Sequence, residues 1–200
     1  KIRQMKKVII PTDFSKNARL ALDFAISNFN DSDTVFWLTH VYRMPYSGAV
    51  VSVDLDDLLK EDREEDMRKE LTAARERFPG LQIKGHAIQG TFIDVISKIV
   101  ENESIEMIVM GTTGATGAKG VLLGSNAANV VRHSKVPVLL YPNGCGISSM
   151  KKVVLASDLK HVKGYETFKA VRQIVKETGS KLDILHLESS TDDEIVKERE

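Results

Sequence analysis

The residues best suited to chemistry lie in a glycine-rich segment that follows an apolar run. The run extends from Met107 to Met110, and glycines at 111, 114 and 124 precede Ser125. Glycine permits positive φ angles and lets backbone N–H groups approach an anion closely, and a helix that opens at Ser125 would direct its N-terminus to the same place. This spacing predicts a phosphate-binding loop at the end of a buried strand.

The spacing of these glycines differs from the two commonest phosphate loops. No Gly-Lys-Ser/Thr follows at the Walker position, and no Gly-x-Gly-x-x-Gly turn connects a strand to a helix. The pattern G-x-x-G-x9-G-S instead resembles the nucleotide-binding signature of the ATP-binding branch of the universal stress protein family. Three further landmarks of that family occur in the expected order, at 6–13, 38–41 and 134–140, so the resemblance covers residues 5–142.

The resemblance implies a site for an adenine nucleotide, which would be ATP, ADP or AMP, with or without Mg²⁺. In this pattern the backbone of Val41 meets the adenine edge, and Gly111 and Gly114 lie against the ribose and the first phosphates. Gly124 and the two residues after it hold the distal phosphates. The binding residues that we expect are Pro11, Thr12, Asp13, Val41, Met110, Gly111, Thr113, Gly114, Gly124, Ser125 and Asn126.

Two of these residues also have a purely structural interpretation. The carboxylate of Asp13 can accept hydrogen bonds from a ribose or from adenine, or it can cap the first helix, although Ser15 could cap that helix alone. Ser125 can donate to a phosphate and can also serve as an ordinary N-cap. The resemblance is weaker at Thr112 and Thr113, where family members often carry a histidine or an arginine, and at Asn126, where a valine or a threonine is frequent.

The other candidate ligating residues favour structural roles. His40 and His186 occupy equivalent positions at predicted strand ends, and no acidic residue or cysteine recurs at ligand spacing beside them, so satisfied structural histidines are favoured over a metal pair. The acidic runs within 54–66 lack the glycine and terminal glutamate of an EF-hand and indicate a solvated helix face. We therefore expect no metal site and no catalytic residues. The single cysteine, Cys145, excludes an internal disulfide.

Composition limits the possible partners. Lys and Arg together number 28, as do Asp and Glu, so the formal net charge gives no indication of a polyanionic partner such as a nucleic acid. No apolar run approaches the roughly 20 residues that span a bilayer. We expect a cytoplasmic protein with neither nucleic acid nor membrane as a partner.

Apolar runs alternate with helical patterns, which is typical of a parallel sheet with helices on both faces. The predicted strands are 7–11, 34–41, 82–88, 107–110 and 137–141. The resemblance implies an open five-stranded parallel sheet of order 3-2-1-4-5, Rossmann-like and similar to the adenine nucleotide alpha hydrolases. Ligands of such sheets lie where the strand order reverses, which would bring 11–13 beside 111–114.

The helical patterns predict which side chains pack inward. Ser15 is expected to cap a helix whose apolar face consists of Ala18, Ala21, Leu22 and Ala25. An irregular stretch at 42–53 is expected before a long, charged helix at 55–78. Its inward-facing residues are expected to be Leu58, Leu59, Met67, Leu71 and Ala74.

The chain contains a weak internal repeat. Residues 151–158 repeat 6–13, and 182–187 repeat 36–41, which indicates tandem copies of one unit. We expect a universal stress protein domain at 1–142 with the nucleotide site, a linker at 143–150, and a partial second repeat at 151–200. The second copy keeps Asp158 but has no glycine loop, so it cannot form a complete nucleotide site. For the first copy, the family resemblance and the edge position of the last strand imply a homodimer through residues 138–141.

Three functions are compatible with these features. The first is an ATP-binding universal stress protein that acts as a nucleotide-dependent regulatory module in a stress response. The second is a slow ATPase or autophosphorylating protein that uses Ser125, Thr112 or Thr113. The third is a nucleotide-free dimerisation module. The glycine loop argues against the third, and the second is disfavoured because the sequence shows no obvious base, metal and charge clamp for phosphoryl transfer.

Overall fold

The computed structural model describes residues 6–43, 53–114, 123–146, 148–157 and 168–186. These residues form two compact units, of which the first extends from 1 to 148 and the second from 149 to 200. Each unit has its own parallel sheet.

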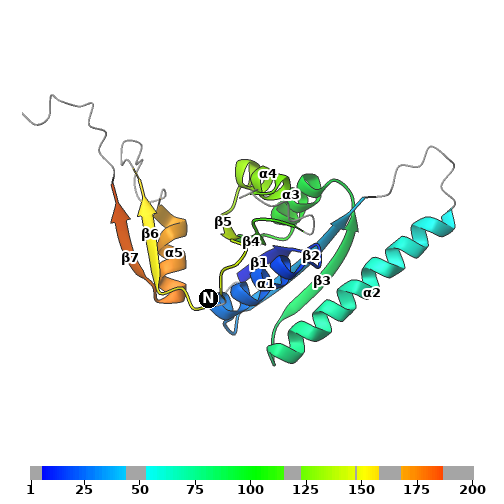
Figure 1. Cartoon of the computed structure of the whole chain (residues 1–200), viewed down its shortest axis with the longest axis horizontal. Coiled ribbons are helices and arrows are strands. Elements are labelled where there is room, and N and C mark those ends of the chain that lie inside the picture. Colours follow the sequence, from blue (N-terminus) through cyan, green and yellow to red (C-terminus); the bar gives the residue numbers. More distant parts are fainter. Residues whose placement is uncertain (1–5, 44–52, 115–122, 147, 158–167, 187–200) are drawn as a thin grey trace, which may run out of the picture. The chain divides into compact units, whose positions relative to one another are not determined.

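The first unit is built on a five-stranded sheet of order β3-β2-β1-β4-β5 (Figure 1). Every neighbouring pair is parallel. The strands are β1 (Lys6–Pro11), β2 (Thr34–Tyr42), β3 (Ile83–Gln89), β4 (Met107–Gly111) and β5 (Val138–Tyr141). The expected fold class and strand order are therefore confirmed, and the strand order reverses between β1 and β4.

Four helices cover this sheet. They are α1 (Lys16–Phe29), α2 (Val53–Arg77), α3 (Phe92–Asn102) and α4 (Ser125–His133). Figure 1 shows α3 and α4 together on one face, with α1 and α2 on the other, so the expectation of helices on both faces of the sheet is confirmed. Within the described ranges, no helix has the length and apolarity needed to cross a membrane.

The central strands are buried because helices lie on both faces. In β1, residues 8–11 are all buried, and so are residues 107–110 of β4. Such continuous apolar runs are typical of the inner strands of parallel sheets. On the α3 and α4 side, Ile9, Ile108 and Val130 belong to one buried cluster.

Helix α1 begins as its sequence predicts. The backbone of Ser15 is extended, and its Oγ accepts a hydrogen bond from the N–H of Ala18 at 3.2 Å, so Ser15 is the N-cap. All four residues of the expected apolar face are buried. The position of the first turn of α1 is therefore fixed relative to the end of β1.

Helix α2 packs on β3 mainly through its second half. Met67 and Ala74 are buried as expected, and a Cβ at Gly85 of β3 would lie only 2.7 Å from Cγ of Met67, so the glycine allows a close approach. The expectation for Leu58 was wrong, because this side chain is 60% exposed near the start of the helix. An irregular stretch was expected at 42–53. Its first residue, Tyr42, instead belongs to β2 and its last, Val53, to α2, and residues 44–52 lie outside the described ranges.

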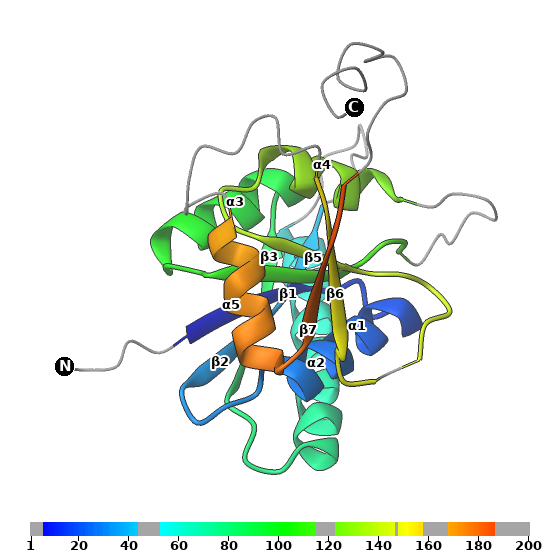
Figure 2. The same ribbon diagram turned by 90° about the vertical axis from the view of Figure 1, so that its left-hand side faces the viewer.

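The second unit is a β-α-β motif. It consists of β6 (Lys152–Ala156), α5 (Lys169–Thr178) and β7 (Lys181–Leu185), and the two strands are parallel neighbours (Figure 2). Gly179 ends α5 in the left-handed conformation, with φ of 65°, which glycine adopts without strain. The predicted content of two strands and one helix is confirmed for the described part of this unit, and Asp158 lies outside it.

Candidate functional site

A hollow of about 310 Å³ lies in the first unit, beside the ends of β1 and β4. All eleven residues of the expected binding set line it, although they come from segments far apart in the sequence. The lining also includes four residues outside that set, Ala18, Phe92, Thr112 and Ala127. The volume is at the lower end of the usual range for small-molecule sites, which begins near about 300 Å³.

The hollow opens because the two central strands turn to different partners at their ends. Beyond β1, the N–H of Thr12 donates to the carbonyl oxygen of Thr39 on β2 at 2.8 Å. Beyond β4, the N–H of Thr112 donates to the carbonyl oxygen of Tyr141 on β5 at 3.0 Å. The chains after β1 and β4 thus bond to strands on opposite sides, which leaves the crevice expected where the strand order reverses.

The turn after β1 fixes the position of Asp13. Its Oδ1 accepts a hydrogen bond from the N–H of Ser15 at 3.0 Å, and Oγ1 of Thr12 accepts one from the N–H of Phe14, also at 3.0 Å. Phe14 has a φ of 60°, which is uncommon for a bulky residue and costs energy. Because Ser15 caps α1, the alternative that Asp13 is the helix cap does not hold, and its carboxylate lines the hollow.

The glycines of the loop make room for side chains of the β1–α1 segment. A Cβ at Gly114 would lie 2.6 Å from Oδ2 of Asp13, and a Cβ at Gly111 would lie 2.5 Å from Nδ2 of Asn17. Either contact is closer than real Cβ atoms tolerate. Asn17 was not among the expected binding residues, because no local sequence pattern indicates that its side chain lies against Gly111.

Helix α4 directs its N-terminus to the same hollow. Its N-cap is Gly124, and Ser125 is the first helical residue, so the alternative of Ser125 as an ordinary N-cap is wrong. The N–H of Gly124 donates to the carbonyl oxygen of Thr112 at 2.7 Å, which ties the helix start to the end of β4. The first N–H groups of a helix lack partners within it and, together with the helix dipole, favour an anion.

His40 has a structural role beside the hollow. Its Nδ1 lies 2.8 Å from the carbonyl oxygen of Thr12, and because a carbonyl only accepts, Nδ1 carries the proton. Burial lowers the pKa of His40 below its ordinary value, so the neutral ring is favoured. In the second unit, Nδ1 of His186 makes the same contact with the carbonyl oxygen of Ser157 at 3.0 Å. These contacts favour the structural interpretation over a metal pair.

In the part of the chain that the structure describes, no group of three or more His, Cys, Asp or Glu side chains gathers as a metal site would require. Asp13 is the acidic side chain in the lining of the hollow. Lys119, which could add a positive charge to the loop, lies outside the described residues.

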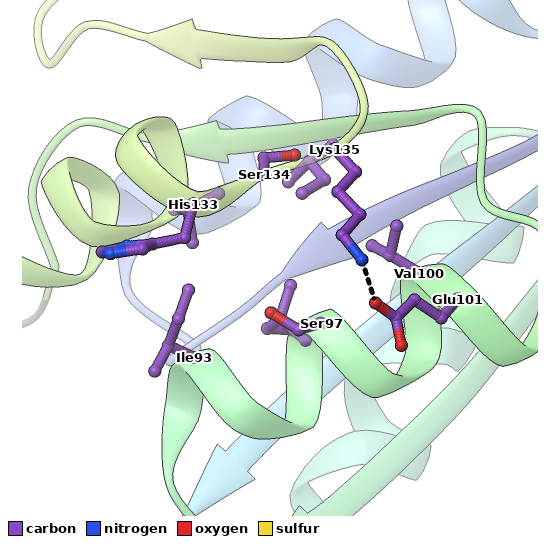
Figure 3. A pocket seen from close by; sticks show the side chains of 10 residues that line it. Ile93, Ser97, Val100, Glu101, His133, Ser134 and Lys135 are labelled. Atoms are coloured by element: carbon purple, nitrogen blue, oxygen red, sulfur yellow. Dashed lines mark hydrogen bonds and ion pairs between the residues drawn. The ribbon is translucent and has the colours of Figure 1, made fainter.

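A second, smaller hollow lies between α3 and α4 (Figure 3). Its lining includes the apolar residues Ile96, Ile108 and Val130, and its volume is about 40 Å³. An ion pair of 2.7 Å joins Lys135 to Glu101 at one end. This space is far below the roughly 300 Å³ of a small-molecule site, and none of the expected binding residues lines it, so the hollow beside β1 and β4 is the candidate site.

Comparison with known proteins identifies the family of the chain. The sequence pattern of the universal stress protein family matches residues 5–142. The universal stress protein MJ0531 of Methanocaldococcus jannaschii is 32% identical over 139 residues, which is 68% of this chain and 81% of that protein. The chain therefore belongs to the universal stress protein family.

Solved structures of this family share the fold. A universal stress protein from Archaeoglobus fulgidus superposes with a TM-score of 0.65 at 22% identity, over 98% of this chain and 72% of that one. A universal stress protein in complex with cAMP superposes with a TM-score of 0.50 at 24% identity, over 72% of this chain and 98% of that one. The structural neighbours thus include a family member with a bound adenine nucleotide.

Proposed function

We propose that the hollow between β1 and β4 binds an adenine nucleotide, with ATP as the principal ligand, and that the chain acts as a nucleotide-dependent regulatory module in a stress response. The observation that carries this proposal is the gathering of the eleven expected residues around one hollow. The family includes a protein solved with cAMP, which supports an adenine nucleotide as the ligand class.

The base and ribose would bind at the β1 and β2 side of the hollow. Val41 lies near the end of β2, where its backbone N–H and C=O can pair with the edge of adenine. Asp13 extends from the end of β1, and its carboxylate can accept hydrogen bonds from ribose hydroxyls. Pro11, Thr12 and Met110 complete this wall of the hollow.

The phosphates would bind between the glycine turn and α4. The backbone N–H groups around Gly111, Thr113 and Gly114 face one side of the ligand in this proposal. The start of α4, with Gly124, Ser125 and Asn126, supplies N–H groups, a hydroxyl and an amide on the other side. Mg²⁺ would enter as a complex with the nucleotide, because its coordination relies on phosphate oxygens and water more than on protein ligands.

The same lining supports binding more than turnover. Efficient phosphoryl transfer needs a base or a group that orients water, together with a cationic clamp on the transferring phosphate. The described lining offers one carboxylate and several hydroxyls, and it contains no lysine or arginine. We therefore propose that any ATP hydrolysis or autophosphorylation through Ser125, Thr112 or Thr113 is slow.

Isothermal titration calorimetry with ATP tests the proposal, and Gly124→Val is the informative variant. A Cβ at Gly124 already lies 3.3 Å from the carbonyl oxygen of Thr112, so the branched side chain must occupy the space in front of α4. We expect the affinity for ATP to fall at least about tenfold, or about 1.4 kcal/mol.

The matched control is Gly146→Val. A Cβ added at Gly146 would meet no heavy atom of the described residues within 4 Å, so the same substitution there should leave ATP affinity unchanged. Retention of wild-type affinity in Gly124→Val would show that the phosphates bind elsewhere. The absence of ATP, ADP and AMP binding to the wild-type chain at millimolar ligand would favour the nucleotide-free dimerisation module.

We further propose that two copies of the chain associate through β5. This strand is the outer strand of the five-stranded sheet on the β4 side, so one row of its backbone groups has no neighbouring strand within the described part of the unit. Val138, Leu139 and Leu140 are only partly buried. Analytical ultracentrifugation of Leu139→Lys tests the interface, which predicts a dimer for the wild type and a monomer for the variant.

A further inference from the structure

Asn17 forms a tether between α1 and the glycine turn. It stands at the second position of α1 and is only 7% exposed. Its Nδ2 donates to the carbonyl oxygen of Thr113 at 2.9 Å, across 96 residues of sequence. Because a carbonyl oxygen only accepts, this contact determines which end of the side-chain amide faces the turn.

The tether also determines where one backbone donor of the turn points. The carbonyl of Thr113 and the N–H of Gly114 belong to the same peptide plane, and in a trans peptide these two groups point in opposite directions. With the carbonyl held toward α1, the N–H of Gly114 points away from α1. Thr112 is held by other contacts, because its N–H donates to the carbonyl oxygen of Tyr141 on β5 and its carbonyl oxygen accepts from the N–H of Gly124, the N-cap of α4.

The energetics of Asn17 favour a functional role over a contribution to stability. Its Oδ1 is buried and has no hydrogen-bond partner in the described part of the chain. A buried polar atom without a partner costs about 1–3 kcal/mol. An alanine or leucine at this position would avoid that cost, so the asparagine is best explained by what its other amide atom does for the turn.

We propose that Asn17 is a positioning residue for the phosphate half of the nucleotide site. It holds the turn at 111–114 so that the N–H of Gly114 and the start of α4 face the same phosphate group. This inference rests on the proposed nucleotide-binding function. It predicts that Asn17 controls affinity for the phosphates and leaves recognition of the base to Val41, which lies on β2.

Calorimetric titration of the full chain with ATP and with adenosine separates the two halves of the site. Asn17→Ala removes the donor without adding a charge, and Asn17→Asp keeps the shape but turns an oxygen toward the Thr113 carbonyl. The matched control is Asn28→Asp in the same helix, where Nδ2 of Asn28 donates to the carbonyl oxygen of Phe24 at 2.9 Å.

Both Asn17 variants should lose ATP affinity by about tenfold or more, whereas adenosine affinity should change by less than about threefold. The Asn28→Asp control should keep both affinities. An unchanged ATP affinity in Asn17→Ala, or an equal loss for ATP and adenosine, would overturn the inference. A wild-type chain that binds neither ligand would overturn the proposed function, and this result is visible before any substitution is made.

Amide hydrogen exchange of the ligand-free protein gives a readout that does not depend on binding. The N–H groups at 112–114, beyond the end of β4, should exchange faster in Asn17→Ala than in the wild type, while those of β1 and β4 keep their protection. Equal exchange at 112–114 in the two proteins would contradict the tether. If Asn17→Asp fails to fold by circular dichroism, Asn17→Ala alone decides the result.

Discussion

The two units of the chain share one local motif and differ in what covers it. In both, a histidine near the end of the second strand contacts the carbonyl oxygen of the residue after the first strand. His40, within β2, contacts Thr12, and His186, directly after β7, contacts Ser157. When 151–158 is aligned with 6–13, Val154 corresponds to Ile9. Ile9 is fully buried, whereas Val154 is 55% exposed.

The second strand of the motif shows the same contrast. Alignment of 182–187 with 36–41 matches Ile184 to Leu38, and their exposures are 63% and 1%. In the first unit, α1, α2, α3 and α4 cover the sheet, whereas the described part of the second unit has one helix, α5. We therefore propose that the second unit repeats the first β-α-β motif of the family. A β-α-β motif alone supplies the local contacts of the fold, and the core and the phosphate loop require the additional strands and helices.

The largest expected effect is a difference in the free energy of unfolding between alanine substitutions at the equivalent positions Ile9 and Val154. Ile9→Ala should lower the free energy of unfolding of the first unit by about 2–4 kcal/mol, because it opens a cavity in a buried cluster. Val154→Ala should change the free energy of unfolding by less than about 0.5 kcal/mol, because the side chain is exposed. Urea denaturation followed by far-UV circular dichroism reports on both units, and the fluorescence of Trp37, the single tryptophan of the chain, reports on the first unit alone.

The same denaturation experiment can show that the two units do not differ in the burial of these positions. Equal losses for Ile9→Ala and Val154→Ala would mean that Val154 is covered in solution, and the contrast would disappear. A small loss for Ile9→Ala would mean that the cluster on the α3 and α4 side relaxes around the cavity.

The next largest expected effect is a loss of nucleotide affinity when the glycine loop, which distinguishes the first unit from the second, is altered. In Gly114→Ala the new Cβ would lie 2.6 Å from Oδ2 of Asp13, so the carboxylate must move. If Asp13 binds the ribose, adenosine and ATP affinities should both fall, by about tenfold. This pattern differs from that expected for Asn17→Ala, which should weaken ATP alone.

A double-mutant cycle measured by calorimetry isolates the contact between Gly114 and Asp13. Asp13→Ala alone should weaken adenosine binding, and Gly114→Ala should add little in that background because the displaced group is already absent. Fully additive losses would show that Gly114 acts through its backbone alone and that the close approach of Asp13 has no role in binding.

The sequence allowed the lining of the hollow to be predicted more completely than the contacts that support it. Strand ends and glycine spacing are local features, and the family resemblance provided the strand order, so the residues around the hollow could be named in advance. The contact from Asn17 to Thr113 joins residues 96 positions apart and has no local pattern. The exposure of Leu58 was missed for a similar reason, because helical spacing shows which face is apolar and does not show how far along the helix the sheet extends.

The smallest expected effect is a pH dependence that arises from His40. Burial is the main cause of its lowered pKa, Arg63 lowers it further, and the bond to the Thr12 carbonyl, Asp13 and Asp66 act in the opposite direction. A lowered pKa means that the unfolded chain binds the proton more tightly. The stabilising contribution of His40 is therefore complete above its ordinary pKa of 6.5 and is lost as the pH falls from there toward the folded value.

His40→Gln tests this pH dependence, because glutamine carries an N–H donor and does not titrate in this range. Between about pH 7.5 and about pH 5, the melting temperature should fall less steeply for the variant than for the wild type. His86, whose pKa is also lowered by burial and then by Lys84, contributes to the slope in both proteins, so the difference between the two slopes isolates His40. Identical slopes would mean that His40 is protonated as easily in the folded chain as in the unfolded one, and that its buried position near the candidate site has no electrostatic consequence.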